Sequence, residues 1–257
     1  MCMETSVLMH VPFNPAGFYL FVFGATLLQY NIHYFLKKPV VHHSRRWQWS
    51  VKNNSAYQLL IGIGALMVII GLFSFNFHHF VFLVILGGIT FLYSIPVLPF
   101  KNKKRIKDFG LLKILTISLL WTIVTVWFPI QQSFYGDLMF LLIFIRRFIF
   151  IFVLCLMFDI RDVDIDRRER INTLPAITGI QKAYDIGYVG MGVFILICII
   201  QYIIVHDTRQ LTAMLISAGT TLWLIKYSKQ NHSDLVYLAG FDGMMFLQAL
   251  LVITCSI

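Results

Sequence analysis

Residues 138–170 read LMFLLIFIRRFIFIFVLCLMFDIRDVDIDRRER, and this stretch decides the fold. Its first part, Leu138 to Phe158, is an apolar run that is long enough, at 1.5 Å per residue, to cross a hydrocarbon core of about 30 Å. Its second part, Asp159 to Arg170, holds four aspartates and begins where the apolar run ends. A membrane-spanning helix that leads directly into an acidic segment indicates chemistry at a membrane surface.

The aspartates are spaced so that three of them share one side of a helix. At about 100° per residue, Asp159, Asp162 and Asp166 fall within roughly 60° of one another. Carboxylates this close repel one another, so the arrangement favours a bound cation, and hard oxygen ligands suit Mg²⁺, which usually shares its coordination with a substrate phosphate. The alternative is a solvated loop in which neighbouring arginines neutralise the aspartates.

The composition places the whole chain in a membrane. Of 257 residues, 58% are hydrophobic and 13% are charged, and the mean hydropathy is +0.77. An ordinary soluble domain is less apolar and more charged. We therefore predict an all-α polytopic membrane bundle with about eight complete transmembrane helices. The expected spans lie near residues 13–35, 56–74, 80–98, 111–130, 138–158, 183–205, 211–227 and 235–257.

Lysine and arginine gather in every second loop between these spans, near residues 37–52, 101–107, 161–182 and 226–229. The positive-inside rule places these loops, and the acidic segment with them, on the cytoplasmic side. The net charge of +9 is thus explained by topology, and we predict no nucleic-acid partner. We expect one multi-pass domain over residues 1–257 in the inner (cytoplasmic) membrane, in contact with membrane lipid.

The sequence DIRDVDIDRRERINTLP at 159–175 resembles the second aspartate-rich motif, DxxDxxxD, of the UbiA superfamily of intramembrane prenyltransferases. The matching positions are Asp159, Asp162 and Asp166. The resemblance extends to YSIP at 93–96, to the basic loop at 101–107 and to the span that contains Trp121. Of these features, only the aspartate motif is specific.

The resemblance implies a nine-helix bundle in which Mg²⁺, held by two aspartate-rich motifs, binds a prenyl diphosphate. Loss of diphosphate gives an allylic cation, which a lipophilic, aromatic acceptor captures. Metal ions and basic residues neutralise the leaving diphosphate as the carbon–oxygen bond breaks. The site residues expected from the resemblance are the metal ligands Asp159, Asp162 and Asp166, the catalytic Asn31, and the diphosphate-binding Lys107, Lys113 and Tyr93. Arg170 returns to the acidic face of the helix by its spacing, where it either binds a phosphate oxygen of the diphosphate or neutralises an aspartate.

The chain departs from the family pattern near its N-terminus. The first motif, NxxxDxxxD, aligns on Asn31, but its two aspartate positions then fall on Phe35 and Pro39, which carry no metal ligand. Residues 1–11 resemble only the end of a first span, which gives a nine-helix bundle with a shortened first helix. A catalytically degenerate relative that binds a lipid or prenyl diphosphate without turnover is therefore the alternative function. A transporter is a weaker third interpretation. Its broken helices would place Gly or Pro near the bilayer midplane, whereas the prolines of this chain lie mostly at the ends of the spans.

Arg146 and Arg147 lie inside the span that ends at Asp159. On a continuous helix Arg147 is roughly 18 Å from Asp159, near the middle of the bilayer. An arginine at this depth faces the bundle interior and needs a partner, for which Asp242 in the last span is a candidate. The two arginines form either an ion pair between helices or the wall of a polar cavity.

Overall fold

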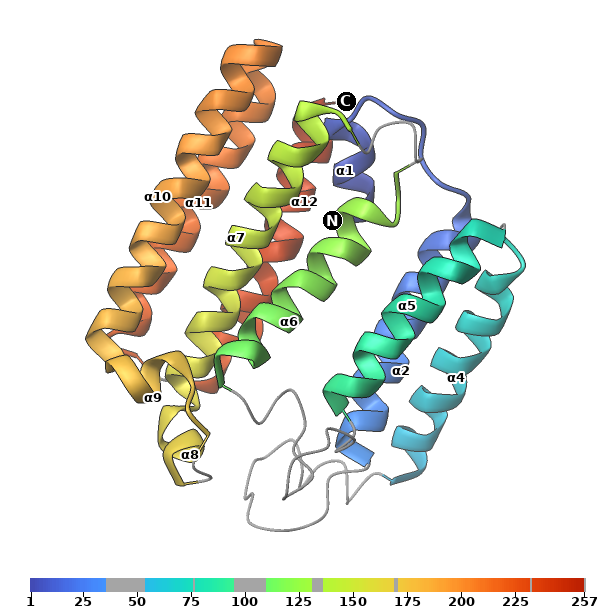
Figure 1. The fold of residues 1–257 in the computed structure, drawn as a ribbon, viewed down its shortest axis with the longest axis horizontal. Helices are drawn as coiled ribbons and strands as arrows, with labels where there is room; N and C mark the ends of the chain where they lie inside the picture. The colour runs from blue at the N-terminus through green and yellow to red at the C-terminus, as the bar shows by residue number, and fades with distance from the viewer. Residues whose placement is uncertain are drawn as a thin grey trace. The chain divides into compact units, whose positions relative to one another are not determined.

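The computed structural model describes residues 1–35, 54–75, 77–94, 110–130, 136–168, 171–231 and 233–256. In this described part of the chain the regular elements are eleven α-helices and two π-helical segments (Figure 1). The chain divides into two compact units, residues 14–81 and residues 1–13 with 82–257.

The unit of residues 14–81 is built on α2 (Ala16–Phe35) and α4 (Asn54–Leu72), which pack against each other. Glycines line the contact. A Cβ atom on Gly71 would lie 2.7 Å from the carbonyl oxygen of Gly17, and one on Gly64 would lie 3.2 Å from that of Gly24. Small residues of this kind let the backbones of two membrane helices approach closely. Close approach matters because lipid tails are as apolar as the side chains, so helices associate in a membrane through van der Waals packing and not through the hydrophobic effect.

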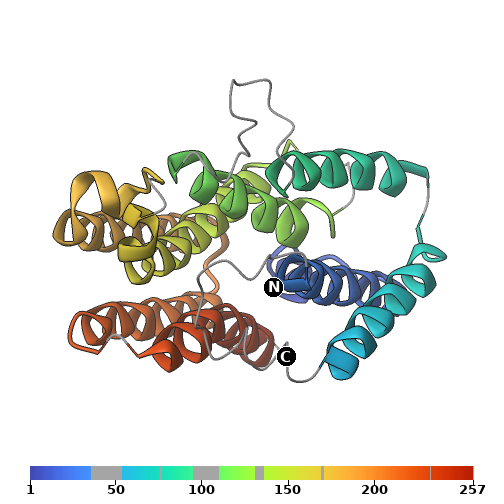
Figure 2. The same ribbon diagram turned by 90° about the horizontal axis from the view of Figure 1, so that it is seen from below.

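The larger unit contains the remaining helices and most of α5, in two layers. α6, α7 and α10 form one layer, and α11, η4 and α12 form the other (Figure 2). α1 packs against α12 and η2. The elements are α1 (Cys2–Leu8), α5 (Phe77–Ser94), α6 (Gly110–Thr122), η2 (Ile123–Trp127), α7 (Leu138–Arg161), α8 (Val163–Arg168), α9 (Leu174–Thr178), α10 (Ile180–Val205), α11 (Thr208–Ser228), η4 (Val236–Phe241) and α12 (Asp242–Ser256).

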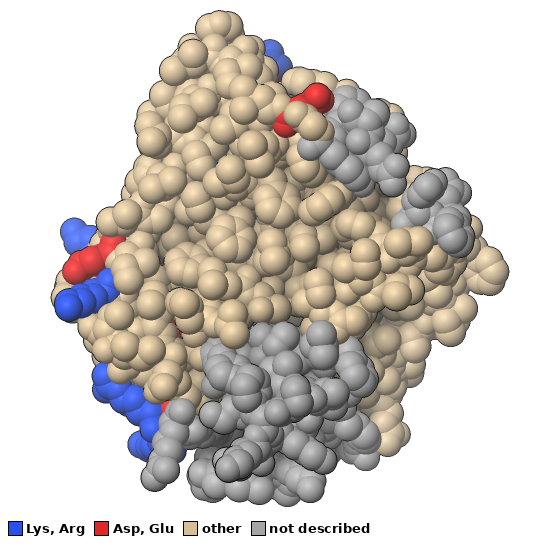
Figure 3. Space-filling view, in the orientation of Figure 1, with Lys and Arg blue, Asp and Glu red and all other residues tan. Residues whose placement is uncertain are grey.

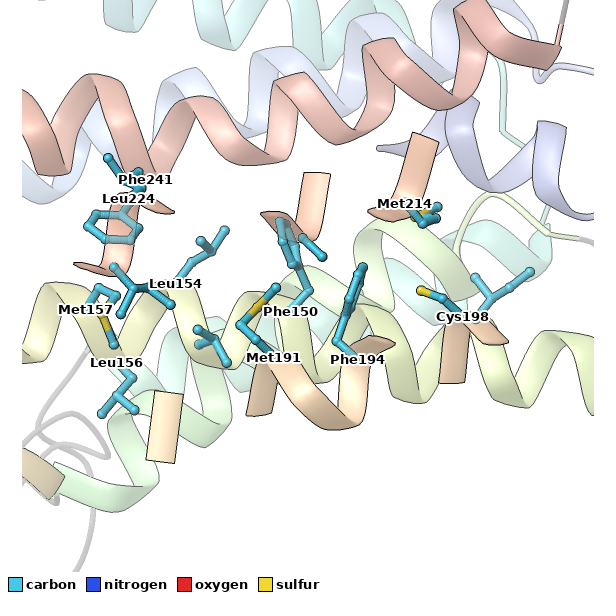
Figure 4. Close-up of a cluster of buried hydrophobic side chains, with 14 of the residues drawn as sticks. Phe150, Leu154, Leu156, Met157, Met191, Phe194, Cys198, Met214, Leu224 and Phe241 are labelled. Carbon is cyan, nitrogen blue, oxygen red and sulfur yellow. The ribbon is translucent and has the colours of Figure 1, made fainter. Parts of the chain in front are cut away.

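The core of this unit lies between α7, α10 and α11. Phe150, Met157, Met191 and Phe194 are fully buried and come from α7 and α10 (Figure 4). The outer surface is apolar as well. On the face shown in Figure 3, the charged side chains lie near the ends of the helices and the broad area between them is uncharged. Apolar side chains on the outside match a hydrocarbon solvent, and charges at the helix ends match the two interfaces.

Each of the eight predicted spans overlaps a helix. Within the described residues, five helices are long and apolar enough to cross a membrane by length and composition: Ser55–Leu72, Gly110–Trp127, Leu138–Arg161, Ile180–Val205 and Val236–Ser256. The apolar parts described for α2 and α5, Ala16–Ile32 and His79–Thr90, are shorter. α11 has 21 residues but is more polar, so it does not meet the same criterion.

Candidate functional site

The acidic segment folds as the end of one helix and a short second helix. α7 ends at Arg161, Asp162 forms the turn with φ −90° and ψ 5°, and α8 then begins at Val163. Asp159 and Asp166 are 4% and 5% exposed. Two carboxylates buried this deeply need a cation, because an uncompensated charge is costly to remove from water.

Lys113, in the first turn of α6, supplies that cation. Its Nζ donates to Asp159 Oδ1 at 2.8 Å and lies 3.7 Å from Asp166 Oδ2. The side chain of Lys113 is 22% exposed. One ammonium therefore bridges the two buried carboxylates, and we call Lys113, Asp159 and Asp166 the carboxylate–lysine cluster.

Asp162 differs from the other two aspartates. Its side chain is 33% exposed, and its Oδ1 accepts from Arg161 Nε at 2.7 Å. The Arg161 guanidinium also lies over the rings of Phe158 and Tyr237, at 5.1 and 5.7 Å. The structure thus brings Asp159 and Asp166 together on one cation and pairs Asp162 with its own neighbour. The turn at Asp162 ends the single helix on which the three-carboxylate face was predicted.

Gly110 holds α6 close to the segment before α9. A Cβ atom at Gly110 would lie 1.9 Å from the backbone oxygen of Asn172, a separation that no side chain allows. Thr173, fully buried, is the N-cap of α9, and Pro175 lies in the first turn, where its missing N–H does no harm. The Asn172–Pro175 segment after the aspartates therefore fixes the start of α6, and with it Lys113.

The cluster fits a magnesium ion that shares its coordination with a ligand. Mg²⁺ is usually bound by one or two carboxylates together with substrate phosphate oxygens. Asp159 and Asp166 supply two carboxylates on one cation, and Asp159 Oδ2 is buried with no hydrogen-bond partner among the described residues. No group of three or more His, Cys, Asp and Glu side chains able to hold a metal occurs in the described part of the chain.

The family model of the UbiA prenyltransferase family matches residues 43–248, well over half of the chain. The chain belongs to the UbiA prenyltransferase family. Searches of curated proteins and of solved structures gave no significant match. Membership in this UbiA family, together with the long apolar helices, makes the protein an integral membrane protein and confirms the resemblance of the chain to the UbiA superfamily.

The other predicted site residues are placed only in part. Asn31 is 9% exposed in α2, and its Nδ2 donates to the backbone oxygen of Leu27 at 2.6 Å. It belongs to the unit of residues 14–81 and precedes the UbiA match, so its role stays a prediction. Tyr93 lies in the last turn of α5, and its side chain is outside the described residues, as are Lys107, Arg170 and Pro39.

Arg147 has a partner that the sequence did not predict. Its Nη2 lies 2.8 Å from Glu4 Oε1, and the two side chains are 1% and 0% exposed. Nη2 also approaches Thr5 Oγ1 at 3.5 Å, and this hydroxyl donates to the backbone oxygen of Thr125 at 2.8 Å. The proposed pairing of Arg147 with Asp242 was wrong. The ion pair instead fastens α1 to α7, far along α7 from the carboxylate–lysine cluster.

The signal that could have identified Glu4 was in the sequence. Glu4 is the only acidic residue before Asp108, and it stands in an otherwise apolar and small-residue segment. A lone carboxylate beside membrane-embedded arginines is a natural counterion.

Proposed function

We propose that the protein is a magnesium-dependent prenyltransferase that moves an isoprenoid chain from a prenyl diphosphate to a lipophilic, aromatic acceptor. The observation that carries the proposal is the carboxylate–lysine cluster. Two carboxylates, more than nine-tenths buried, meet one ammonium at the end of a membrane helix. Membership in the UbiA prenyltransferase family supports the same reaction class.

In this proposal Asp159 and Asp166 hold Mg²⁺, with Asp162 able to join them after release from Arg161. The bound metal would supply Lewis-acid neutralisation of the diphosphate that leaves. Lys113 adds a positive charge beside the carboxylates and binds a phosphate oxygen once it is released from Asp159. Arg170, Lys107 and Tyr93 are further proposed diphosphate ligands, and Asn31 is the proposed catalytic residue from the first motif.

Burial of the cluster serves the chemistry of an allylic cation. A reactive cation is destroyed by water, so a site that ionises a prenyl diphosphate must keep water away from the carbon that loses its oxygen. Asp159 and Asp166 are almost inaccessible, and the neighbouring α7 side chains Leu156 and Met157 are fully buried.

The proposal includes a topology. We count α2, α5 and α11 as spans beside the five longer apolar helices, which gives eight complete spans, with α1 as the shortened first helix of a nine-helix bundle. The chain would form one domain in the inner membrane, with the carboxylate–lysine cluster opening to the cytoplasm. The concentration of lysine and arginine in alternate loops supports this orientation.

A binding experiment tests the proposed site. Purified protein in detergent is incubated with Mg²⁺ and labelled prenyl diphosphates of several chain lengths, and binding is compared for the wild type, Asp159→Asn and Asp166→Asn. The control is Asp164→Asn, because Asp164 lies in the same segment but is exposed. We expect Mg²⁺-dependent binding that both buried substitutions weaken by at least tenfold and the control leaves unchanged. An affinity for prenyl diphosphate that none of the three substitutions changes would show that Asp159 and Asp166 do not form the binding site.

The second candidate function is a degenerate relative that binds a lipid or prenyl diphosphate without transferring it. Phe35 and Pro39, which stand where the first motif has aspartates, favour this candidate. It predicts the same Mg²⁺-dependent binding but no release of diphosphate with any acceptor. The two candidates therefore differ in turnover and agree on the binding site.

A further inference from the structure

A second polar site lies at the other end of α7, α10 and α11. A cavity of about 10 Å³ is bounded by Arg146 of α7, by Gln201 of α10, and by Asp207 and Gln210 at the start of α11. The remaining lining residues are Cys198, Tyr202, Val205, Leu211 and Met214, and Figure 4 shows Cys198 and Met214 near each other at one end of the buried cluster. The α10–α11 turn is at the opposite end of these helices from α8 and α9 (Figure 1), so the cavity is separate from the carboxylate–lysine cluster.

Arg146 is buried without a counterion. The residue is 3% exposed, its Nη1 donates to the neutral Gln201 Oε1, and its guanidinium lies 6.0 Å from the Phe194 ring centroid. Its Nη2 has no hydrogen-bond partner among the residues that the structure describes. Glu4 forms its ion pair with the neighbouring Arg147, and among the described residues no carboxylate lies within 4.0 Å of Arg146. A buried guanidinium in this state is strongly unfavourable unless a negative charge comes to it.

A second donor faces the same space. Gln210 Nε2 is buried and has no hydrogen-bond partner in the described structure, and Gln210 lines the cavity with Arg146. Two unpaired N–H groups, one of them on a cation, favour a guest that accepts hydrogen bonds and carries negative charge. A cavity of this volume holds one water-sized particle and is too small for a phosphate or a lipid headgroup.

Among the described residues that line the cavity, Asp207 is the one that carries a carboxylate. Its Oδ1 accepts from the backbone N–H groups of Arg209 and Gln210 at 2.9 and 3.1 Å and so caps α11. This oxygen is committed to the helix, and Asp207 does not reach Arg146. The Asp207 carboxylate would repel an anion in the cavity. Removing its charge should therefore strengthen anion binding, whereas removing the charge of Arg146 should weaken it.

We propose that this cavity binds a single monatomic anion, a halide such as chloride, between Arg146 and Gln210. The anion supplies the counterion that Arg146 lacks and the acceptor that both donors need. It ties α7 to α10 and α11 on the side away from the carboxylate–lysine cluster. The proposal does not depend on the transferase reaction.

The test compares halide with a bulky anion at constant ionic strength. The melting temperature of the full chain in detergent is measured while sodium chloride replaces sodium gluconate, and ³⁶Cl⁻ binding to the wild type is measured in parallel. We expect a melting temperature that rises with chloride concentration, together with saturable binding of one displaceable chloride per chain. Both signals should be lost in Arg146→Met and kept in Arg209→Gln, a control that removes an exposed arginine from the first turn of α11.

Asp207→Asn keeps a capping oxygen and removes the negative charge. It should lower the half-saturating chloride concentration about fivefold, the effect of removing one like charge a few ångströms away even in a water-like medium. Superimposable chloride and gluconate curves with no bound ³⁶Cl⁻ would show that the cavity holds only water and would overturn the proposal. Loss of halide binding in Asp207→Asn would overturn it as well. The wild-type ³⁶Cl⁻ measurement decides the question even if Arg146→Met does not fold.

Discussion

Replacing Lys113 with methionine tests whether an internal ammonium occupies the place of the metal. In the structure Lys113 Nζ lies 2.8 Å from Asp159 and 3.7 Å from Asp166. Methionine keeps the length and apolar stem of the side chain but leaves both carboxylates buried without their cation. Breaking a buried ion pair from one side costs about 3–5 kcal/mol, so the metal-free variant should unfold at a clearly lower temperature than the wild type.

Magnesium should reverse this effect. In the wild type Mg²⁺ must displace a hydrogen bond between charged groups, worth about 1.5–3 kcal/mol, whereas Lys113→Met has no such bond to break. The variant should therefore bind Mg²⁺ roughly ten- to a hundredfold more tightly, at about 1.4 kcal/mol per factor of ten. The same variant should bind prenyl diphosphate more weakly, because it lacks the ammonium that reaches the phosphate.

The assay is the melting temperature in detergent as a function of Mg²⁺ concentration, since a ligand that binds only the folded state stabilises it by RT ln(1 + [Mg²⁺]/Kd), and tighter binding moves the rise to lower concentration. The matched control is Lys182→Met, because Lys182 is an exposed lysine in the first turn of α10. An unchanged or weaker Mg²⁺ response in Lys113→Met would show that Lys113 and the metal do not compete for the same oxygens. The reasoning about the carboxylate–lysine cluster would then be refuted.

Two further predictions concern the scaffold of the larger unit. Glu4→Gln should destabilise the protein by about 3–5 kcal/mol, because Arg147 keeps its charge and loses its buried partner. The double variant Glu4→Gln with Arg147→Met should be markedly less destabilised than Glu4→Gln alone. A double-mutant cycle on melting temperatures checks this difference. Gly110→Ala should abolish Mg²⁺-dependent diphosphate binding while circular dichroism shows retained helix, whereas Gly192→Ala, with nothing within 4 Å of the new methyl, should leave binding intact.

The sequence predicted the helices well because the apolar runs are long and their basic loops alternate. All eight expected spans overlap helices, and α7 begins at Leu138 as the run predicts. Three of the eight predicted spans differ from the other five: the apolar parts described for α2 and α5 are shorter, and α11 is more polar. α11 contains the whole expected span, but its threonines, serines and basic residues make it less apolar than the five clearest spans.

The sequence predicted those site residues that lie close together in the chain, and it did not predict contacts between residues that are far apart in the chain. Asp159 and Asp166 are seven residues apart, so helical periodicity placed them on one side, and both are buried there. The pairing of Asp159 with Lys113 joins residues 46 positions apart, and that of Glu4 with Arg147 joins residues that are even farther apart in the sequence. Contacts of this kind depend on helix packing, which periodicity does not encode. The turn at Asp162, which ends α7 before α8 begins, is likewise not encoded in that periodicity.

The central claim is that the carboxylate–lysine cluster ionises a prenyl diphosphate, and release of inorganic diphosphate measures this directly. Wild-type protein in lipid vesicles, given Mg²⁺, a labelled prenyl diphosphate and a panel of aromatic lipophilic acceptors, should release diphosphate together with a prenylated product. Asp159→Asn should lower the rate by at least a hundredfold, and Asp164→Asn should not change it. Tight Mg²⁺-dependent binding without diphosphate release from any acceptor would contradict the claim and establish the degenerate binder in its place.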